Sequence, residues 1–399
     1  MRRRPFLRRL RQFPLLLSVL LFCFFGGRFL PLLRLGLISS LRTLAVASAF
    51  GTRPQQSFQI LYEEFLSEAD SKIEIIPVVE EISPVIRPAE PTLPIEPEIE
   101  VIPETPVPLP PVEIPEEFQG PIIEETMLGQ AKTGFPSYGK GLIKNNTELA
   151  DGELLFIISE PHSLSLSAEG PQVLVYHTHA TESYEPYDST VYDTRNTWRS
   201  TDEQENMIAV GEELCAAMEA HGISVIHDTT LHDYPSYNGS YERSAATISS
   251  YLEKYPTISV LLDVHRDAVQ REETLVKPVT EIDGEKTAQL MMIAGCDSKG
   301  SLNIPTWKEN LRFGARIQDK IESLYPTLCR PLFVTHRKYN QHLSSASLLL
   351  EVGSHGNTLE EARCCGRMAG DAIGAYLAEL LNSAAGESPP GTNPGAGHD

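Results

Sequence analysis

The sequence predicts an α/β fold with a mostly parallel central sheet flanked by helices, and two patterns lead to this prediction. Short, continuous apolar runs are typical of strands buried on both faces of a sheet, and they occupy residues 173–176, 258–264, 288–294 and 347–352. Between these runs, helical patterns cover residues 206–221, 241–254 and 307–325. Strands that alternate with helices of this length indicate βαβ units, and therefore parallel strands.

Weaker signals add elements to this order. Residues 141–147 are expected to form a short strand and a turn. Gly222 is expected to end a helix, and residues 223–226 then form a strand. Thr358-Leu-Glu-Glu361 is a capping box, which predicts the start of the last helix, and that helix is expected to end near Leu381.

The amino-terminal segment, residues 1–45, has the pattern of a membrane anchor. Residues 1–42 contain nine arginines and no acidic residue, and an apolar run over 13–27 continues beyond Arg28. A bilayer span needs roughly 20 residues, and an arginine near the interface can extend toward the headgroups. We expect an uncleaved membrane helix, with a cleaved signal peptide as the alternative. The positive-inside rule predicts a single-pass protein with its catalytic domain outside the cytoplasm.

A Pro/Glu-rich segment follows the anchor. From Pro77 to Pro121 there are 13 prolines and ten glutamates but a single basic residue, Arg87. Proline removes hydrogen-bond donors and like charges repel, so residues 46–130 are expected to form an extracytoplasmic stalk and a disordered linker. Residues 131–383 then form the predicted catalytic domain, and the Gly/Pro-rich residues 384–399 a disordered tail.

Charge and cysteine content exclude two classes of protein. The net charge is −21, and beyond residue 42 the chain has 24 basic and 54 acidic residues, which gives −30. Nucleic acid would repel such a body, so no nucleic-acid partner is expected. Six cysteines without a CxxC pair in a chain of 399 residues argue against a disulfide scaffold or a zinc ribbon.

Three predicted strands end in residues that can carry chemistry. The first is followed by His177-Thr-His179-Ala-Thr-Glu182, the second ends in Asp263-Val-His265-Arg-Asp267, and the last in Glu351-Val-Gly353. Ligands bind beyond the carboxyl ends of the strands in such sheets. Two histidines and a carboxylate with an open position for water are the ligands of a catalytic zinc site, although spacing alone permits another divalent ion. A separate carboxylate would serve as the general base.

Several of these residues have more than one interpretation. Glu351 closes an apolar run, where a carboxylate is costly to bury without a metal or a base nearby, or it interacts with the start of the last helix. Asp263 and Asp267 are candidates for orienting a histidine. Arg266 pairs with Asp267 or holds a carboxylate of the substrate.

Four motifs together resemble the stage II sporulation protein P family of peptidoglycan hydrolases. They are His177-Thr-His-Ala-Thr-Glu-Ser-Tyr184, Asp263-Val-His-Arg-Asp-Ala268, Tyr339-Asn-Gln-His342 and Glu351-Val-Gly with Asn357-Thr-Leu-Glu-Glu-Ala362. The resemblance implies a fold similar to zinc-dependent N-acetylmuramoyl-L-alanine amidases and cleavage of the amide between N-acetylmuramic acid and L-alanine, with endopeptidase activity on peptide cross-links. It also implies the sporulation proteins D and M as partners, and a role in septal thinning and forespore engulfment.

The resemblance also implies roles for individual residues. His179, Glu182 and His265 are expected to bind Zn2+, and Glu351 to act as the general acid and base. His177 competes with His179 for the ligand role, because both point the same way in an extended stretch; otherwise it orients a ligand or binds substrate. His342 is a candidate hydrogen-bond donor to the transition state. The alternatives are an inactive wall-binding scaffold and a zinc carboxypeptidase acting on stem peptides.

Overall fold

The computed structural model describes residues 113–128 and 134–384. The membrane helix predicted within residues 1–45, most of the predicted linker and the tail beyond residue 384 lie outside these ranges. Within them, no helix has both the length and the apolar character needed to cross a membrane.

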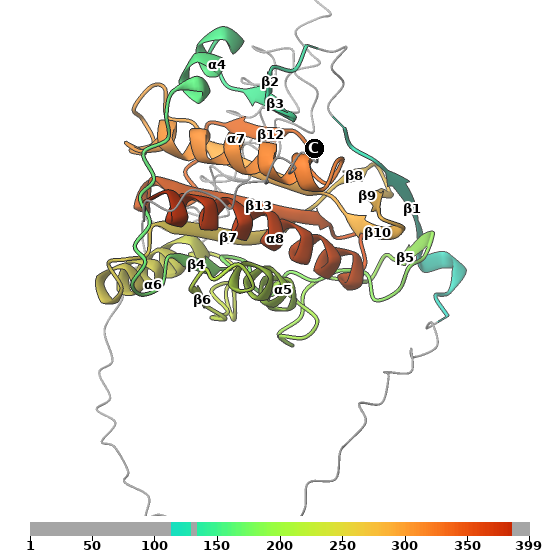
Figure 1. Ribbon diagram of the computed structural model, residues 1–399. Helices are drawn as coiled ribbons and strands as arrows, with labels where there is room; N and C mark the ends of the chain where they lie inside the picture. Colours follow the sequence, from blue (N-terminus) through green and yellow to red (C-terminus); the bar gives the residue numbers. More distant parts are fainter. Residues whose placement is uncertain (1–112, 129–133, 385–399) are drawn as a thin grey trace, which may run out of the picture. The chain divides into compact units, whose positions relative to one another are not determined.

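An eight-stranded sheet forms the centre of the domain (Figure 1). Its strands, in spatial order, are β2 (Ser137–Tyr138), β3 (Gly141–Asn146), β12 (Leu332–Thr335), β11 (Leu290–Gly295), β13 (Ala346–Ser354), β7 (Val260–Asp267), β4 (Val173–Tyr176) and β6 (Val225–His227). β4, β7 and β13 are adjacent and parallel, so their carboxyl ends lie at the same edge of the sheet. This is the arrangement that the apolar runs predicted.

Helices cover both faces of this sheet. Their bounds are α4 (Asp151–Ser159), α5 (Met207–Glu219), α6 (Ser240–Lys254), α7 (Trp307–Leu324) and α8 (Leu359–Ala384). Figure 1 shows α7 and α8 side by side across one face, and residues of α5, α7 and α8 share one large core with that face. On the other face, Ile248 of α6 packs with Leu174, Tyr176 and Leu261 in a smaller core.

The capping box predicted for the last helix is present. The Glu361 amide donates to Oγ1 of Thr358 at 3.2 Å, and the Thr358 amide donates to Oε2 of Glu361 at 3.1 Å. These reciprocal bonds satisfy amides at the start of α8 that have no partner within the helix.

The two sheets together are mixed, so the prediction of mostly parallel strands holds only for the central sheet, where five of seven strand pairings are parallel. β11 runs antiparallel to β13, and β2 antiparallel to β3. Parallel neighbours need a crossover connection, usually a helix. The chain instead passes from β7 to β11 through the hairpin-like strands β8 (Gln270–Arg271), β9 (Thr274–Ile282) and β10 (Glu285–Ala288).

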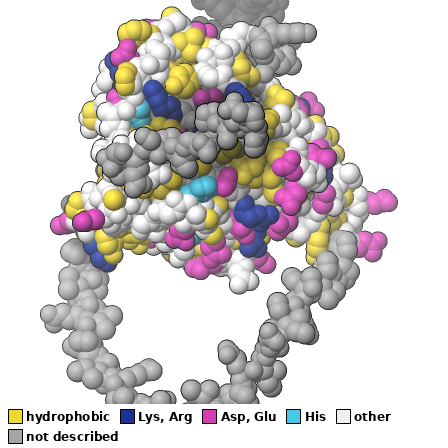
Figure 2. Space-filling model, in the orientation of Figure 1, with side chains coloured by type: hydrophobic (Ala, Val, Ile, Leu, Met, Phe, Trp, Pro, Cys, Tyr) yellow, Lys and Arg dark blue, Asp and Glu magenta, His cyan; other side chains and the backbone are white. Residues whose placement is uncertain are grey.

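These strands belong to a second sheet, which the sequence patterns did not reveal. Its order is β10, β9, β1 (Gln119–Glu125) and β5 (Val191–Asp193), with β8 also paired to β9. β1 follows a short turn, η1 (Glu116–Phe118), and adds a folded strand to the range 46–130 expected to be stalk and linker. Acidic side chains gather on the surface over β10 and β5 (Figure 2).

Candidate active site

The strand-end residues face the side of the sheet that α6 covers. Along β7, Val264 packs in the large core, so its neighbours Asp263 and His265 point to the opposite face. Glu351 on β13 is in register with His265 on the parallel neighbour β7. The two side chains therefore stand next to each other on one face.

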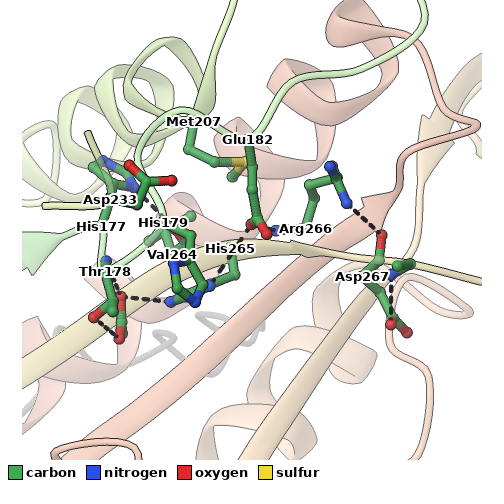
Figure 3. A network of polar contacts seen from close by, with 12 residues as sticks. His177, Thr178, His179, Glu182, Met207, Asp233, Val264, His265, Arg266 and Asp267 are labelled. Atoms are coloured by element: carbon green, nitrogen blue, oxygen red, sulfur yellow. Dashed lines mark hydrogen bonds and ion pairs between the residues drawn. The ribbon is translucent and has the colours of Figure 1, made fainter. Parts of the chain in front are cut away.

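His179, Glu182 and His265 come together there, as the sequence predicted. The rings of His179 and His265 lie edge to face with centroids 5.2 Å apart. Oε2 of Glu182 lies 3.7 Å from Nδ1 of His265. Figure 3 shows the Glu182 carboxylate turned toward His265, with His179 beside them. We call these three residues with Glu351 the strand-end site.

The imidazoles of the strand-end site are oriented by further polar groups. Nε2 of His265 lies 2.8 Å from Oδ1 of Asp263. Asp263 is in turn fixed by Thr178, whose amide and hydroxyl both donate to its carboxylate. Ser240 lies 3.4 Å from Nδ1 of His179. The Nδ1 atom of His265 and the Nε2 atom of His179 are therefore the nitrogens available to a cation, and Asp263 has the orienting role that the sequence suggested.

The site is buried, and its charged groups shift the pKa values of their neighbours. Burial, together with the neighbouring His265, lowers the pKa of His179 to about 4. Burial also opposes the charging of His265, but the Asp263 and Glu182 carboxylates outweigh it and raise its pKa to about 9. Glu182 is buried too, yet Arg266 and the two imidazoles lower its pKa. Near neutral pH His179 is therefore neutral and Glu182 is ionised, which are the forms in which these two groups bind a metal ion.

Glu351 has the properties of a proton carrier. Its Oε2 atom is buried and has no hydrogen-bond partner within the described ranges. Burial, with the nearby Asp267 carboxylate, raises the pKa of Glu351 to about 8. A carboxyl group that titrates near neutral pH beside a candidate metal site is suited to general acid–base chemistry.

Two loops complete the site with residues that the sequence analysis did not single out. Nη2 of Arg199 lies 3.6 Å from Oε1 of Glu182, and its Nη1 lies 2.7 Å from Oδ2 of Asp233. The ring of Tyr237 stacks on His179 with centroids 4.5 Å apart. These residues lie far from the motifs in sequence and share no spacing with them, so the sequence offered no signal for them.

His177 does not share the direction of His179. Its Nδ1 lies 2.9 Å from the Val264 carbonyl, and its Nε2 lies 2.8 Å from Nε2 of His227. A Cβ on Gly211 of α5 would overlap its ring. His177 is thus fully buried on the α5 face, because the chain turns directly after β4 instead of remaining extended. The expectation that both histidines point the same way is wrong.

Arg266 does not pair with the Asp267 carboxylate; its Nη1 donates to the Asp267 carbonyl at 3.4 Å instead (Figure 3). The Arg266 guanidinium donates from Nε to the Ser183 carbonyl at 2.9 Å and from Nη2 to the Trp198 carbonyl at 3.1 Å. Oδ2 of Asp267 instead pairs with Nη1 of Arg330 at 2.8 Å. Arg266 follows His265 along β7 and therefore points to the opposite face, where it fixes the loop after Glu182.

His342 lies in η3 (Gln341–Leu343), a turn that flanks α6. Nδ2 of the preceding Asn340 donates to the Tyr241 carbonyl at 2.9 Å, and Tyr241 lies edge-on to His179 with centroids 5.6 Å apart. η3 therefore borders the site, and the role of His342 toward a substrate stays a prediction.

The donor set of the strand-end site fits a divalent cation such as zinc. It offers two imidazole nitrogens and one carboxylate, each beside a further polar or charged group. A second group of acidic residues, Glu124, Asp188 and Glu361, has ligand atoms within 4.8 Å of one another. There, Nζ of Lys277 lies 2.6 Å from Asp188 and 2.8 Å from Glu361, and Lys286 pairs with Glu124. We call these five residues the lysine-bridged cluster, in which each of the three carboxylates already pairs with a lysine.

Fold and site together define an α/β protein with a buried histidine–carboxylate site at the carboxyl ends of its parallel strands. The chain belongs to the stage II sporulation protein P family, whose model matches residues 127–374. It is 28% identical over 229 residues to the stage II sporulation protein P of Bacillus subtilis (strain 168). That match covers 54% of this chain and 54% of the relative, so the chain spans about half the length of the curated relative it matches. The resemblance inferred from the four motifs is confirmed.

Solved structures similar to this chain include two amidases. One is the CwlD amidase from Clostridioides difficile in complex with the GerS lipoprotein, which is 11% identical, with a TM-score of 0.34, covering 53% of this chain and 99% of that chain. The other is an N-acetylmuramoyl-L-alanine amidase of Nostoc punctiforme, which is 16% identical, with a TM-score of 0.30, covering 55% of this chain and 99% of that chain.

Proposed function

We propose that this chain is a zinc-dependent hydrolase of sporulation peptidoglycan that cleaves the amide between N-acetylmuramic acid and L-alanine, and also acts on peptide cross-links. One observation carries the proposal: the unpartnered Glu351 carboxyl group stands in register with His265, which lies beside His179 and Glu182. Membership of the sporulation protein P family supports the biological setting. The four motifs resemble that family, whose catalytic domain is similar to zinc-dependent amidases, and this supports the choice of bond.

In this proposal His179, Glu182 and His265 hold the zinc ion. When bound, zinc supplies Lewis acidity at the amide carbonyl and acidifies water. Asp263 keeps His265 in one orientation, and Ser240 does the same for His179. Because the two imidazoles and Glu182 are buried, bulk water does not compete for their donor atoms.

Glu351 moves the proton. Its Oε2 takes a proton from the attacking water and delivers it to the departing nitrogen of L-alanine. A pKa near 8 in the protein without metal suits this double role, since both protonation states are accessible near neutral pH. The neighbouring Asp267 is held by Arg330 and leaves Glu351 as the free acid and base.

We further propose that the protein acts at a membrane during sporulation. The arginine-rich apolar residues 1–45 support a single-pass anchor, with the catalytic domain in the space between the mother-cell and forespore membranes. The acidic body excludes nucleic acid as a partner. The sporulation proteins D and M are the proposed partners in septal thinning and engulfment, on the strength of the family resemblance.

Digestion of purified peptidoglycan tests the proposed reaction. The purified full chain should release stem peptides with a new amino-terminal L-alanine. Glu351→Gln should keep zinc but lose turnover by about 10²–10⁴-fold, because it removes only the proton carrier. Release of D-alanine instead would identify a carboxypeptidase. Undigested wall with bound protein would identify a scaffold, and full activity in the variant would remove Glu351 from the mechanism.

A further inference from the structure

A small apolar core in the second sheet lies apart from the large one. Ile122 of β1 is buried with Tyr192 and Leu275, and Trp198 packs against them. Ile122 alternates with the exposed Ile123 along the strand. β1 precedes residues 127–374, the range that the family model matches. Ile122 therefore lies outside the range that the family model matches.

Trp198 connects this core to the chain around Glu182. Glu182 and Arg199 form an antiparallel bridge, flanked by two backbone hydrogen bonds. The Ser183 amide donates to the Trp198 carbonyl at 3.0 Å, and the Ser200 amide donates to the Thr181 carbonyl at 2.8 Å. The backbone of Glu182 is thus held on both sides by the segment 198–200.

The conformation of Trp198 needs support from its surroundings. Its φ is 48°, a left-handed value that a bulky residue rarely adopts. Its indole nitrogen donates to Oε1 of Glu185, and its amide donates to Oδ1 of Asn196. Arg266 donates to its carbonyl, and the His355 ring lies edge-on to the indole with centroids 4.8 Å apart. The apolar support comes from the core that Ile122 closes, in which the Tyr192 ring lies 5.6 Å from the indole. Loss of that apolar support would weaken the hold on Trp198, and with it the hold on the segment that pairs with Glu182.

We infer that Ile122 is a positioning residue for Glu182, acting through Trp198 and Arg199. Its side chain keeps the segment 198–200 paired with 181–183, so that the Glu182 carboxylate stays beside His265. The inference rests on the proposed function in taking Glu182 as a metal ligand. It assigns to β1, which lies within the predicted linker range, a part in building the site.

Two neighbouring isoleucines on one strand provide a matched test. The purified full chain contains two tryptophans, Trp198 and Trp307, so Trp307→Phe leaves Trp198 as the single fluorophore. In that background, Ile122→Asn should weaken zinc binding by about 10–100-fold, the usual effect of losing support for a ligand. It should also shift the Trp198 emission to longer wavelength. Ile123→Asn should change neither, and Ile122→Leu should retain both.

The outcomes separate this inference from the proposed function. A parent that binds no zinc would overturn the proposed function, while the emission shift would still test the support of Trp198. Zinc affinity and emission that are equal in Ile122→Asn and Ile123→Asn would overturn the inference and leave the function standing. If Ile122→Asn fails to fold, Ile122→Ala against Ile123→Ala carries the same comparison, and the same two results decide it.

Discussion

The strand-end site and the lysine-bridged cluster both gather acidic side chains, but they differ in what neutralises them. In the lysine-bridged cluster, Lys277 is 1% exposed and lies within ion-pair distance of Glu124, Asp188 and Glu361. In the strand-end site, imidazoles stand beside the carboxylates, and Oε2 of Glu351 is buried without a partner in the described part of the chain.

The difference shows that proximity of carboxylates does not by itself identify a metal site. The lysine-bridged cluster has the tighter set of acidic ligand atoms, yet its own cations complete it. In the strand-end site Arg199 lies 3.6 Å from Glu182, but two imidazoles also stand beside that carboxylate, so the site combines nitrogen donors with an oxygen donor. Donor chemistry therefore makes the strand-end site the better candidate for a metal ion, in line with the proposed function.

The largest expected effect on stability comes from the lysine-bridged cluster. Lys277→Met would leave the buried Glu361 without its closest cation, and removing one partner of a buried pair costs about 3–5 kcal/mol. Lys286→Met is the matched control, because Lys286 is 38% exposed and such pairs contribute about 1 kcal/mol or less. Denaturant unfolding measures both. Equal losses in the two variants would contradict the structural role of Lys277.

A smaller effect is expected when the orientation of His265 is disturbed. Asp263→Asn removes the charge 2.8 Å from Nε2 of His265, and it should weaken zinc binding by about 10–100-fold. Asp188→Asn is the same substitution in the lysine-bridged cluster and should leave zinc affinity unchanged. Calorimetric titration with zinc compares the two, and the account fails if Asp188→Asn has the larger effect.

The last expected effect is a pH dependence of stability. Burial, with Asp267 nearby, raises the pKa of Glu351 from 4.5 to about 8. Between these values the folded, metal-free chain keeps a proton that the unfolded chain releases, so stability falls as pH rises through this range. The gain in Tm on Glu351→Gln should therefore grow from about pH 5 to about pH 8.5. A gain in Tm that does not change with pH would show that the pKa of Glu351 is not raised in the folded chain.

The sequence predicted the strands that carry the site because burial on both faces leaves an unambiguous apolar run. β4, β7 and β13 are such strands, and the polar residues that follow them stand out. It missed β1, β9 and β10, whose polar and charged residues mask the strand pattern. Hairpins through these strands reverse the direction of β11, which no apolar pattern encodes.

Within the site, the sequence predicted which residues come together better than it predicted where their side chains point. His179, Glu182 and His265 were expected to meet and do so. His177 was placed on the same side as His179, because a turn after β4 cannot be recognised from residue spacing. Arg199 remained unnoticed since its contact with Glu182 depends on a loop that returns from the second sheet.

Zinc content of the purified full chain tests the central claim most directly. The account predicts one zinc ion per chain in the parent and in the double variant Glu124→Gln/Asp188→Asn, and none in His265→Ala. These variants remove donors from the two clusters in turn, so the same measurement compares both. Zinc retained in His265→Ala but lost from the double variant would contradict the account and place the metal in the lysine-bridged cluster.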